Sequence, residues 1–213
     1  MTSQPSSGGL YYSNKLARIT LLALEEVMGR HGVNAILNLA GLSRFINNYP
    51  PDNNEKAFAF EDYAAICAAL EAMYGPRSGR GLAIRAGRAC FSQGLQQFGA
   101  LAGVGSAEFK LLPLDEKIMA GLQTLAEIFS NYSDQQTSVG LHADGYEYVL
   151  QTCPMCAGRS SVDGKPLGHV GIGVLREGLS WVSGGKEFRV EEVECMATGG
   201  KVGRYVIYRD PIG

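Results

Sequence analysis

The sequence predicts an α+β fold in which helices pack on one face of a twisted antiparallel sheet, preceded by a helical N-terminal region. Amphipathic segments with apolar residues at helical spacing occupy the chain up to about residue 135. Beyond that point the pattern changes to short strand-like runs that come in pairs around turns, with one further helical segment between the pairs. Helices followed by hairpins, rather than a regular alternation of strand and helix, indicate α+β organisation.

The predicted helices are marked by apolar residues that recur near every third or fourth position. In the first helix, Leu16, Ile19 and Ala23 fall on one face. An Asn-, Asp- and Pro-rich loop at 47–54 and a Gly-rich break at 74–81 separate the later helices. The helices are expected at 10–29, 33–42, 60–73, 82–98, 115–129 and 170–182.

Two hairpins are predicted in the last third of the chain. Residues 137–142 and 146–152 alternate in character around an Asp144-Gly145 turn. Residues 188–197 and 202–208 form the second pair, joined by a Thr-Gly-Gly-Lys turn. Residues 99–113 are expected to be irregular. Together with the helices, these strands supply an antiparallel sheet with one covered face.

The chain of 213 residues predicts a single domain at 10–213, mostly helical over 10–135 and sheet plus helix over 136–213, with a flexible tail at 1–9. A net charge of −2 argues against nucleic acid as a partner. No apolar run approaches the ~20 residues of a membrane span. The tail lacks the features of a signal peptide, so we expect a cytoplasmic protein whose five cysteines are reduced.

Three cysteines near the C-terminus are candidate metal ligands. Cys153 and Cys156 can supply two thiolates from one tight turn, and Cys195 a third from a strand. His169 or Glu192 can supply the fourth ligand of a tetrahedral zinc site, with His169 preferred. The alternative is that these thiols are buried, inert or redox-active groups. Two further cysteines, Cys67 and Cys90, lie in apolar helices and are expected in the core.

Arginines and glycines gather at the start of the helix at 82–98. Arg85 and Arg88, with Arg77 and Arg80 before them, could bind the carboxylate of a ligand in bidentate fashion. Alternatively, they pair with nearby acidic residues on the surface. No Gly-Lys-Ser/Thr follows, and no strand precedes the Gly-x-Gly, so the segment predicts neither a P-loop nor a nicotinamide or flavin site.

The same helix carries small residues that leave room for a neighbouring helix or for a flat ligand. Aromatic and apolar side chains that could line such a pocket come from three predicted helices, although at these spacings they also suit an ordinary core. They are Phe91, Leu95, Phe98, Phe129 and Trp181. His142, on a predicted strand, is a candidate axial ligand of a tetrapyrrole metal or simply an exposed strand histidine.

The C-terminal motifs resemble those of a known family. The pattern Cys153-x-x-Cys156, Pro166-x-x-His169, Glu192-x-x-Cys195-x-Ala197-x-Gly199 resembles the 4-vinyl reductase domain, also called the hydrocarbon-binding domain. The resemblance implies the fold of the TRAPP core subunits, a homodimer, and an apolar pocket for a tetrapyrrole beside a structural zinc. Gly168 and Gly203 stand where the family usually has cysteines, so two of its zinc ligands are replaced.

Three functions follow from these observations. The first is a binding protein for a hydrophobic small molecule, a tetrapyrrole such as chlorophyll, a precursor or a bilin, that serves pigment synthesis, delivery or photosystem assembly. It would work beside photosynthetic membranes with a photosynthetic protein complex. The second is a vinyl reductase of (bacterio)chlorophyll biosynthesis or its accessory subunit, for which the sequence offers no redox cofactor motif. The third is a dimeric trafficking-like or regulatory interaction module.

Overall fold

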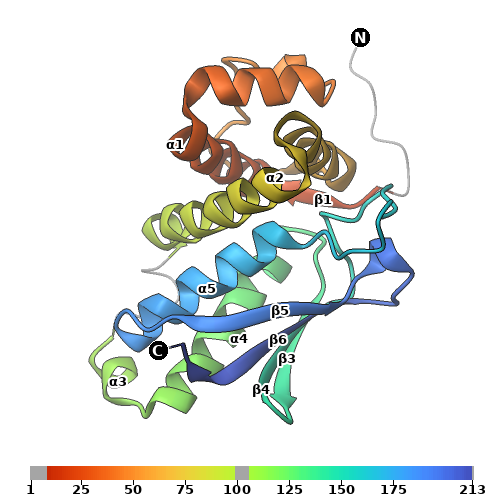
Figure 1. Cartoon of the computed structure of the whole chain (residues 1–213). Coiled ribbons are helices and arrows are strands. Elements are labelled where there is room, and N and C mark those ends of the chain that lie inside the picture. Colours follow the sequence, from red (N-terminus) through yellow and green to blue (C-terminus); the bar gives the residue numbers. More distant parts are fainter. Residues whose placement is uncertain (1–8, 99–105, 213) are drawn as a thin grey trace.

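The computed structural model describes residues 9–98 and 106–212 and shows a layer of helices stacked on a four-stranded antiparallel sheet (Figure 1). The predicted α+β class, with helices and antiparallel sheets, is confirmed. No helix among the described residues is both long enough and apolar enough to cross a membrane. The predicted tail at 1–9 falls almost entirely outside the described residues.

The chain begins with a short strand rather than a helix. Strand β1 (Tyr11–Ser13) pairs antiparallel with β2 (Lys56–Ala59), and helix α1 (Asn14–Leu39) follows directly. The prediction of helix from residue 10 is therefore wrong. Ser13 is the N-cap, and its side chain accepts a hydrogen bond from the Leu16 backbone, so the helix can begin only after it.

Two glycines bend long helices that the sequence predicts as separate ones. Helix α1 combines the predicted helices 10–29 and 33–42 across a kink at Gly29, which has a φ of 73°. Helix α2 (Phe60–Phe98) combines 60–73 and 82–98 across Gly75, with a φ of 74°. The predicted loop at 74–81 is otherwise helical, because Pro76 begins the new helical segment, where its missing N–H is not needed.

Between α2 and the sheet the chain forms two more helices. Helix α3 (Ala107–Leu111) lies in the segment 99–113 expected to be irregular, and its Ser106 cap and Glu108 give it a proper start. The rest of that expectation, at 99–105, lies outside the described residues. Helix α4 (Leu114–Tyr132) matches the helix predicted at 115–129.

The sheet has the strand order β3-β4-β6-β5, with every neighbouring pair antiparallel. Its strands are β3 (Thr137–His142), β4 (Gly145–Leu150), β5 (Phe188–Glu194) and β6 (Gly203–Pro211). Both predicted hairpins are present, and helix α5 (His169–Ser183) lies between them, ending at Gly184 in the left-handed conformation. Two short 3-10 turns, Ser43–Phe45 and Met196–Thr198, complete the elements.

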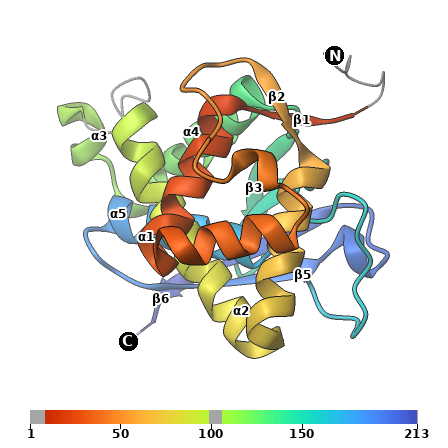
Figure 2. The same cartoon turned by 90° about the horizontal axis from the view of Figure 1, so that it is seen from above.

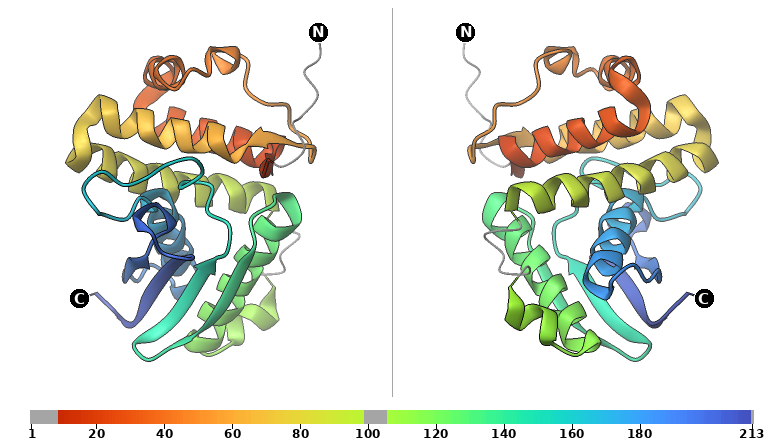
Figure 3. Two further views of the ribbon diagram at one scale, coloured as in Figure 1. Left: turned by 90° about the vertical axis from the view of Figure 1, so that its right-hand side faces the viewer. Right: turned by 90° about the vertical axis from the view of Figure 1, so that its left-hand side faces the viewer.

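The helices form layers above one face of the sheet. Helix α5 lies directly on the sheet, α4 packs beside it against β3, and α2 crosses α5 on the side away from the sheet (Figure 1). Helix α1 packs on α2 as the outermost layer, as the view from above shows (Figure 2). The two side views show the helical layer and the sheet as two halves that meet along α2 and α5 (Figure 3).

Helices α2 and α5 cross in direct backbone contact. A Cβ added to Gly87 would lie 2.9 Å from the Cα of Gly173 and would overlap the carbonyl oxygen of Val170. A Cβ added to Gly173 would in turn overlap the carbonyl oxygen of Ile84. The small residues of the predicted helix 82–98 therefore serve, at this point, the close approach of a neighbouring helix. The other use considered for them, room for a ligand, applies further along α2.

Candidate functional site

An apolar cavity of about 140 Å³ lies between the helical layer and the sheet. Its walls come from α1 and α2 on one side, from α4 and α5 on two others, and from β4 and β6 at the base. None of the described residues that line it carries a charged side chain, and aliphatic and aromatic groups dominate the lining. An uncharged cavity of this kind favours an apolar guest over water.

The apolar residues singled out from the sequence meet at this cavity. Phe91, Leu95 and Phe98 line it from the end of α2, Phe129 lines it from α4, and Trp181 from α5. Trp181 stacks on Phe109 of α3 and is 40 % exposed, so it is both a lining residue and part of the surface. Their shared location supports the predicted role, and direct contact with a ligand stays a prediction.

A few polar groups stand in this apolar wall. The Tyr12 hydroxyl donates to Gln135 Oε1 at 3.0 Å, and the Gln135 amide donates to the Thr137 hydroxyl at 3.0 Å. The Tyr148 hydroxyl makes no hydrogen bond of good geometry among the described residues, although the residue is only 3 % exposed and the Thr137 side chain lies close enough to oppose the rise of its pKa. Burial raises the pKa of Tyr12, Tyr63 and Tyr148, so these hydroxyls stay neutral donors. A buried donor without a partner is an available contact for a ligand acceptor.

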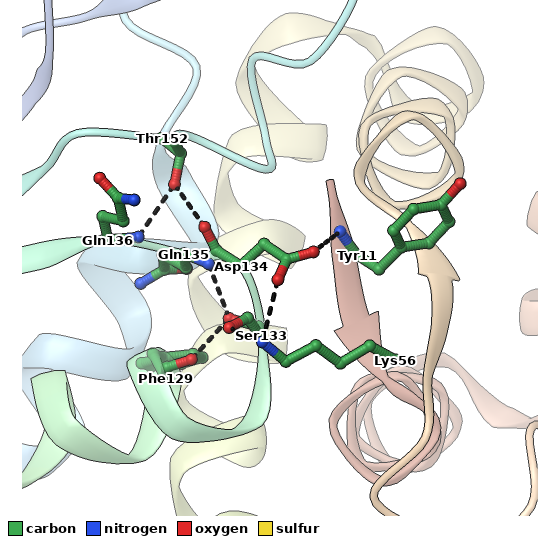
Figure 4. A network of polar contacts seen from close by, with 8 residues as sticks. All are labelled: Tyr11, Lys56, Phe129, Ser133, Asp134, Gln135, Gln136 and Thr152. Atoms are coloured by element: carbon green, nitrogen blue, oxygen red, sulfur yellow. Dashed lines mark hydrogen bonds and ion pairs between the residues drawn. The ribbon is translucent and has the colours of Figure 1, made fainter. Parts of the chain in front are cut away.

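A polar network fixes the segment that carries Gln135 (Figure 4). Asp134 accepts hydrogen bonds from the Tyr11 backbone at 2.9 Å and from Lys56 at 2.9 Å, which ties the start of the sheet to the β1–β2 ribbon. The Ser133 hydroxyl donates to the Phe129 carbonyl at 2.6 Å, and Thr152 links the Asp134 carbonyl to the Gln136 backbone. The network therefore holds both Phe129 and Gln135 at the cavity wall.

The two arginines proposed as ligand contacts do not line the cavity. Arg88 donates to Glu177 at 2.9 Å and to Glu187 at 2.6 Å, and these partners raise the pKa of its guanidinium. Arg85 is exposed on α2. The alternative reading, in which such arginines pair with acids at the surface, describes Arg88, although its partners come from α5 and the segment before β5. His142 lies at the end of β3 beside Asp144, also away from the cavity.

A buried cluster of thiols and one carboxylate lies outside the cavity lining, although Met155 of the same turn does line it. The sulfur atoms of Cys153 and Cys156 are 2.7 Å apart, and those of Cys156 and Cys195 are 3.7 Å apart. A carboxylate oxygen of Glu192 and the sulfurs of Cys156 and Cys195 all lie within 4.8 Å of one another. The three predicted cysteines therefore do come together. The hydrogen bond with Cys153 raises the pKa of Cys156 to about 12, and burial raises that of Glu192 to about 8.

The fourth member of this cluster is Glu192 rather than His169. His169 is the first residue of α5, and burial lowers its pKa to about 4, helped by Arg80 and Arg159. It does not belong to the group of ligand atoms within 4.8 Å of one another, which consists of Cys156, Glu192 and Cys195. No contact among the described residues joins it to that group as the 2.7 Å contact with Cys156 joins Cys153. The sequence allowed either residue in fourth place. It could not choose between them, because the choice depends on how α5 and β5 are placed relative to each other.

The remaining cysteines are apart from this cluster. Cys67 is buried in the core, as expected, and burial raises its pKa to about 12. Cys90 is half-buried and lines the cavity, and burial of its sulfur also raises its pKa to about 12. Both thiols are therefore protonated at neutral pH.

Several lining residues were not anticipated from the sequence. Tyr12, Met155 and Tyr205 line the cavity from β1, from the Cys153–Cys156 turn and from β6, as do Tyr148 and Gln135. Only Tyr148 had a usable signal, since Tyr146, Tyr148 and Leu150 alternate along β4 and must share one face. The others depend on which strand lies beside which.

The fold is similar to that of solved H-NOX structures, while neither a family model nor a curated protein matches the sequence. An H-NOX protein from S. oneidensis in the Fe(II)NO state is 11 % identical with a TM-score of 0.59, covering 92 % of this chain and 99 % of that one. An oxygen-binding H-NOX domain related to soluble guanylate cyclases is 15 % identical with a TM-score of 0.57, covering 94 % and 97 %. A structure described as modulating heme redox potential through porphyrin distortion is 16 % identical with a TM-score of 0.56, covering 94 % and 97 %.

This comparison corrects the family suggested by the sequence. The solved structures that match are H-NOX domains, so the resemblance to the 4-vinyl reductase domain is wrong. The resemblance rested on a motif of cysteines, a histidine and turn glycines. Such a motif describes a local cluster of side chains and its turns, and this kind of cluster can occur in many folds. The chlorophyll pathway, the photosynthetic complex, the TRAPP likeness and the homodimer lose the resemblance on which they depended. At these identities the comparison shows that the chain has the H-NOX type of fold.

Proposed function

We propose that this chain is a binding domain that encloses an apolar, uncharged, flat small molecule in the cavity between α2, α4, α5 and the sheet. The observation that carries the proposal is the cavity itself: about 140 Å³, without a charged residue in its described lining, and with an unpartnered Tyr148 hydroxyl in the wall. An apolar cavity of ~150 Å³ holds a benzene ring. The preferred ligand therefore has one aromatic ring inside, an acceptor atom for Tyr148, and an extension toward Trp181.

A tetrapyrrole is the second candidate, because one of the similar structures is described by its heme and porphyrin. It would have to widen the cavity. Heme iron is usually held by His, Cys, Met or Tyr side chains. The three histidines of the chain, all of them in its described part, lie outside the lining. Burial keeps Cys90 and the lining tyrosines protonated, which leaves Met155 as the remaining ligand type in the described lining. The described lining also offers no basic partner for propionates. A histidine-ligated heme does not fit these residues, so a metal-free or esterified ring is the better member of this class.

The test uses Trp181, the single tryptophan of the chain, as the reporter. Prodan, an uncharged planar naphthalene with one carbonyl acceptor, is titrated into the protein while Trp181 quenching and the prodan emission maximum are followed. We expect saturable quenching and a blue shift of the dye. Absence of saturable binding by prodan, protoporphyrin IX and hemin alike would refute the proposal.

Two glycines of α2 provide a matched pair of variants. Gly94 lines the cavity, Gly81 is exposed outside it, and a Cβ added to either meets nothing within 4 Å. Gly94→Leu should fill the cavity and lower prodan affinity at least ~10-fold, by about 1.4 kcal/mol. Gly81→Leu should leave it unchanged, while both replacements favour the helix. Equal affinities for the two variants would place the dye somewhere else.

Porphyrins separate the two ligand classes. If a tetrapyrrole is the ligand, protoporphyrin IX should displace prodan and should lose affinity in Gly94→Leu. Hemin should then bind no more tightly than the metal-free ring, since the described lining provides no histidine for the iron. A strong preference for hemin would contradict this reading of the site.

A further inference from the structure

The thiol–carboxylate cluster stands apart from the proposed ligand cavity in its chemistry. Its four members come from two distant parts of the chain: Cys153 and Cys156 from the turn after β4, and Glu192 and Cys195 from the end of β5. The ligand atoms of Cys156, Glu192 and Cys195 all lie within 4.8 Å of one another, and Cys153 adjoins them through its contact with Cys156. All four residues are 1–8 % exposed. Three thiols and a carboxylate in one buried site can act together as metal ligands once their protons are lost, and a bound cation then offsets the cost of burying groups of one sign.

The distances suit a tetrahedral metal ion that prefers sulfur. With zinc–sulfur bonds of about 2.3 Å, two sulfur ligands stand about 3.8 Å apart. The Cys156 and Cys195 sulfurs are 3.7 Å apart without any adjustment. Cys153 lies on the same short turn, and its sulfur, at 2.7 Å from that of Cys156, must move away by about 1 Å for both to bind one tetrahedral ion.

The Glu192 carboxylate is positioned to act as a metal ligand. Its Oε2 accepts the Gly168 backbone N–H at 2.6 Å, and its Oε1 is buried without a hydrogen-bond partner among the described residues. Among the described residues Glu192 forms no ion pair, and Arg159, which follows the Cys153–Cys156 turn, pairs with Glu71 at 2.6 Å. The Gly168 contact orients the carboxylate, as outer-shell partners do for metal ligands.

We propose that Cys153, Cys156, Cys195 and Glu192 bind one zinc ion, or another divalent cation that prefers thiolate ligands. Each thiol that ionises on binding releases its proton. Because all four ligands come from the protein, the site has no open position and is a structural one. The bound ion fastens the turn after β4 to the end of β5. This assignment stands on the cluster alone and does not depend on what the cavity binds.

The zinc site would also steady one wall of the cavity. Tyr148, Tyr205 and Glu192 are paired in one cross-strand row over β4, β6 and β5. The Tyr205 hydroxyl donates to the Gly168 carbonyl at 3.2 Å, next to the N–H that Glu192 accepts, and Tyr205 lines the cavity. Met155, between the two ligands of the turn, lines it as well. Metal occupancy therefore fixes two side chains of the ligand wall.

The first experiment measures metal content. Protein purified under reducing conditions without added chelator is analysed by elemental and native mass spectrometry, and we expect one zinc per chain. Cys195→Ser should lose it, and Cys67→Ser, which replaces a buried cysteine outside the cluster, should keep it. A folded, reduced wild-type protein that neither contains zinc nor binds it on titration overturns the proposal. So does a Cys153–Cys156 disulfide that persists in the reduced preparation.

The second experiment remains informative if Cys195→Ser fails to fold. Cobalt(II) replaces zinc in the intact wild-type protein, and three thiolates with one oxygen in a tetrahedron should give thiolate charge-transfer bands and intense visible bands. Glu192→Gln should retain the thiolate bands, change the visible bands and weaken binding more than ~10-fold. A weak, octahedral-type spectrum, or one that Glu192→Gln leaves unchanged, contradicts this ligand set. Prodan binding, measured in parallel, reports on the cavity separately.

Discussion

Two buried tyrosines on one strand make it possible to distinguish the effect of ligand contact from that of burial alone. Tyr146 and Tyr148 of β4 are both almost fully buried, and both hydroxyls have no hydrogen-bond partner among the described residues. Only Tyr148 lines the cavity. The two residues face the same side of the sheet because they are two positions apart. Their difference is therefore one of position along the strand.

We predict that Tyr148→Phe lowers the affinity for prodan about 5- to 10-fold, which corresponds to the ~1–1.5 kcal/mol of one hydrogen bond. Tyr146→Phe should not change it. Neither variant should lose more than ~1 kcal/mol of stability, because neither hydroxyl makes a hydrogen bond of good geometry among the described residues, although Thr137 lies near Tyr148 and Asp115 near Tyr146. Trp181 quenching gives the affinity, and urea unfolding gives the stability. A similar loss of affinity in both variants would show that the effect comes through the sheet.

Individual site residues were predictable where chemistry is local. The Cys-x-x-Cys turn and the apolar residues of α2 could be chosen from the sequence, because each belongs to one short segment. The roles of Arg88, His169 and Glu192 were not settled in this way. Arg88 finds Glu177 and Glu187 on elements almost a hundred residues away, and such partners leave no trace in its own neighbourhood.

At the scale of elements, the crossing of α2 over α5 decides where the cavity can be. The backbones touch at Gly87 and Gly173, and seven residues further along α2 the helices have diverged enough for Gly94 to face open space. The glycines of α2 thus serve two purposes on one helix. Close contact at one end of the crossing permits a cavity at the other end, because two rigid helices that cross at an angle must separate.

We predict that Gly87→Ala destabilises the protein by about 3 kcal/mol or more, because the new methyl group meets backbone atoms of α5 that cannot move aside. Gly81→Ala, on the same helix in open space, should instead stabilise it by up to ~1 kcal/mol. Urea unfolding followed by circular dichroism measures both. Equal effects would mean that the helices do not touch at Gly87.

The positions of most helices and strands were predictable from the sequence, and the way in which consecutive helical segments connect was not. Helices α4 and α5 and both hairpins agree with the periodicity of the sequence. The merging of segments at Gly29 and Gly75 was missed because a glycine and a proline signal a bend without saying whether a helix continues after it. Strands β1 and β2 were missed because three or four residues are too short to show alternation.

At the scale of the whole molecule, the cavity is lined by α1 and α2 of the helical layer and by β4 and β6 of the sheet, so a ligand there contacts both. A ligand that binds only the folded chain adds RT ln(1 + [L]/Kd) to its stability. At a hundredfold excess over Kd this amounts to ~2.7 kcal/mol, or a rise in melting temperature of about 5–10 °C for a chain of this size.

We therefore predict that saturating prodan raises the melting temperature of the wild-type protein and of Gly81→Leu but not that of Gly94→Leu. Differential scanning calorimetry measures the shift without relying on a fluorescent reporter. A rise of the same size in Gly94→Leu would show that the dye stabilises the protein from a site outside the cavity.

The sequence by itself determined the α+β class, most helices and strands, the Cys153-x-x-Cys156 turn and the apolar character of the α2 face. All of these follow from residue spacing within single segments, where period and turn chemistry act locally. Only the tertiary structure decided the cavity, the unpaired Tyr148 hydroxyl, the surface pairing of Arg88 and the choice of Glu192 over His169. These depend on how α5 lies between α2 and the sheet, because contacts between distant segments are set by packing and not by the spacing of residues within either one.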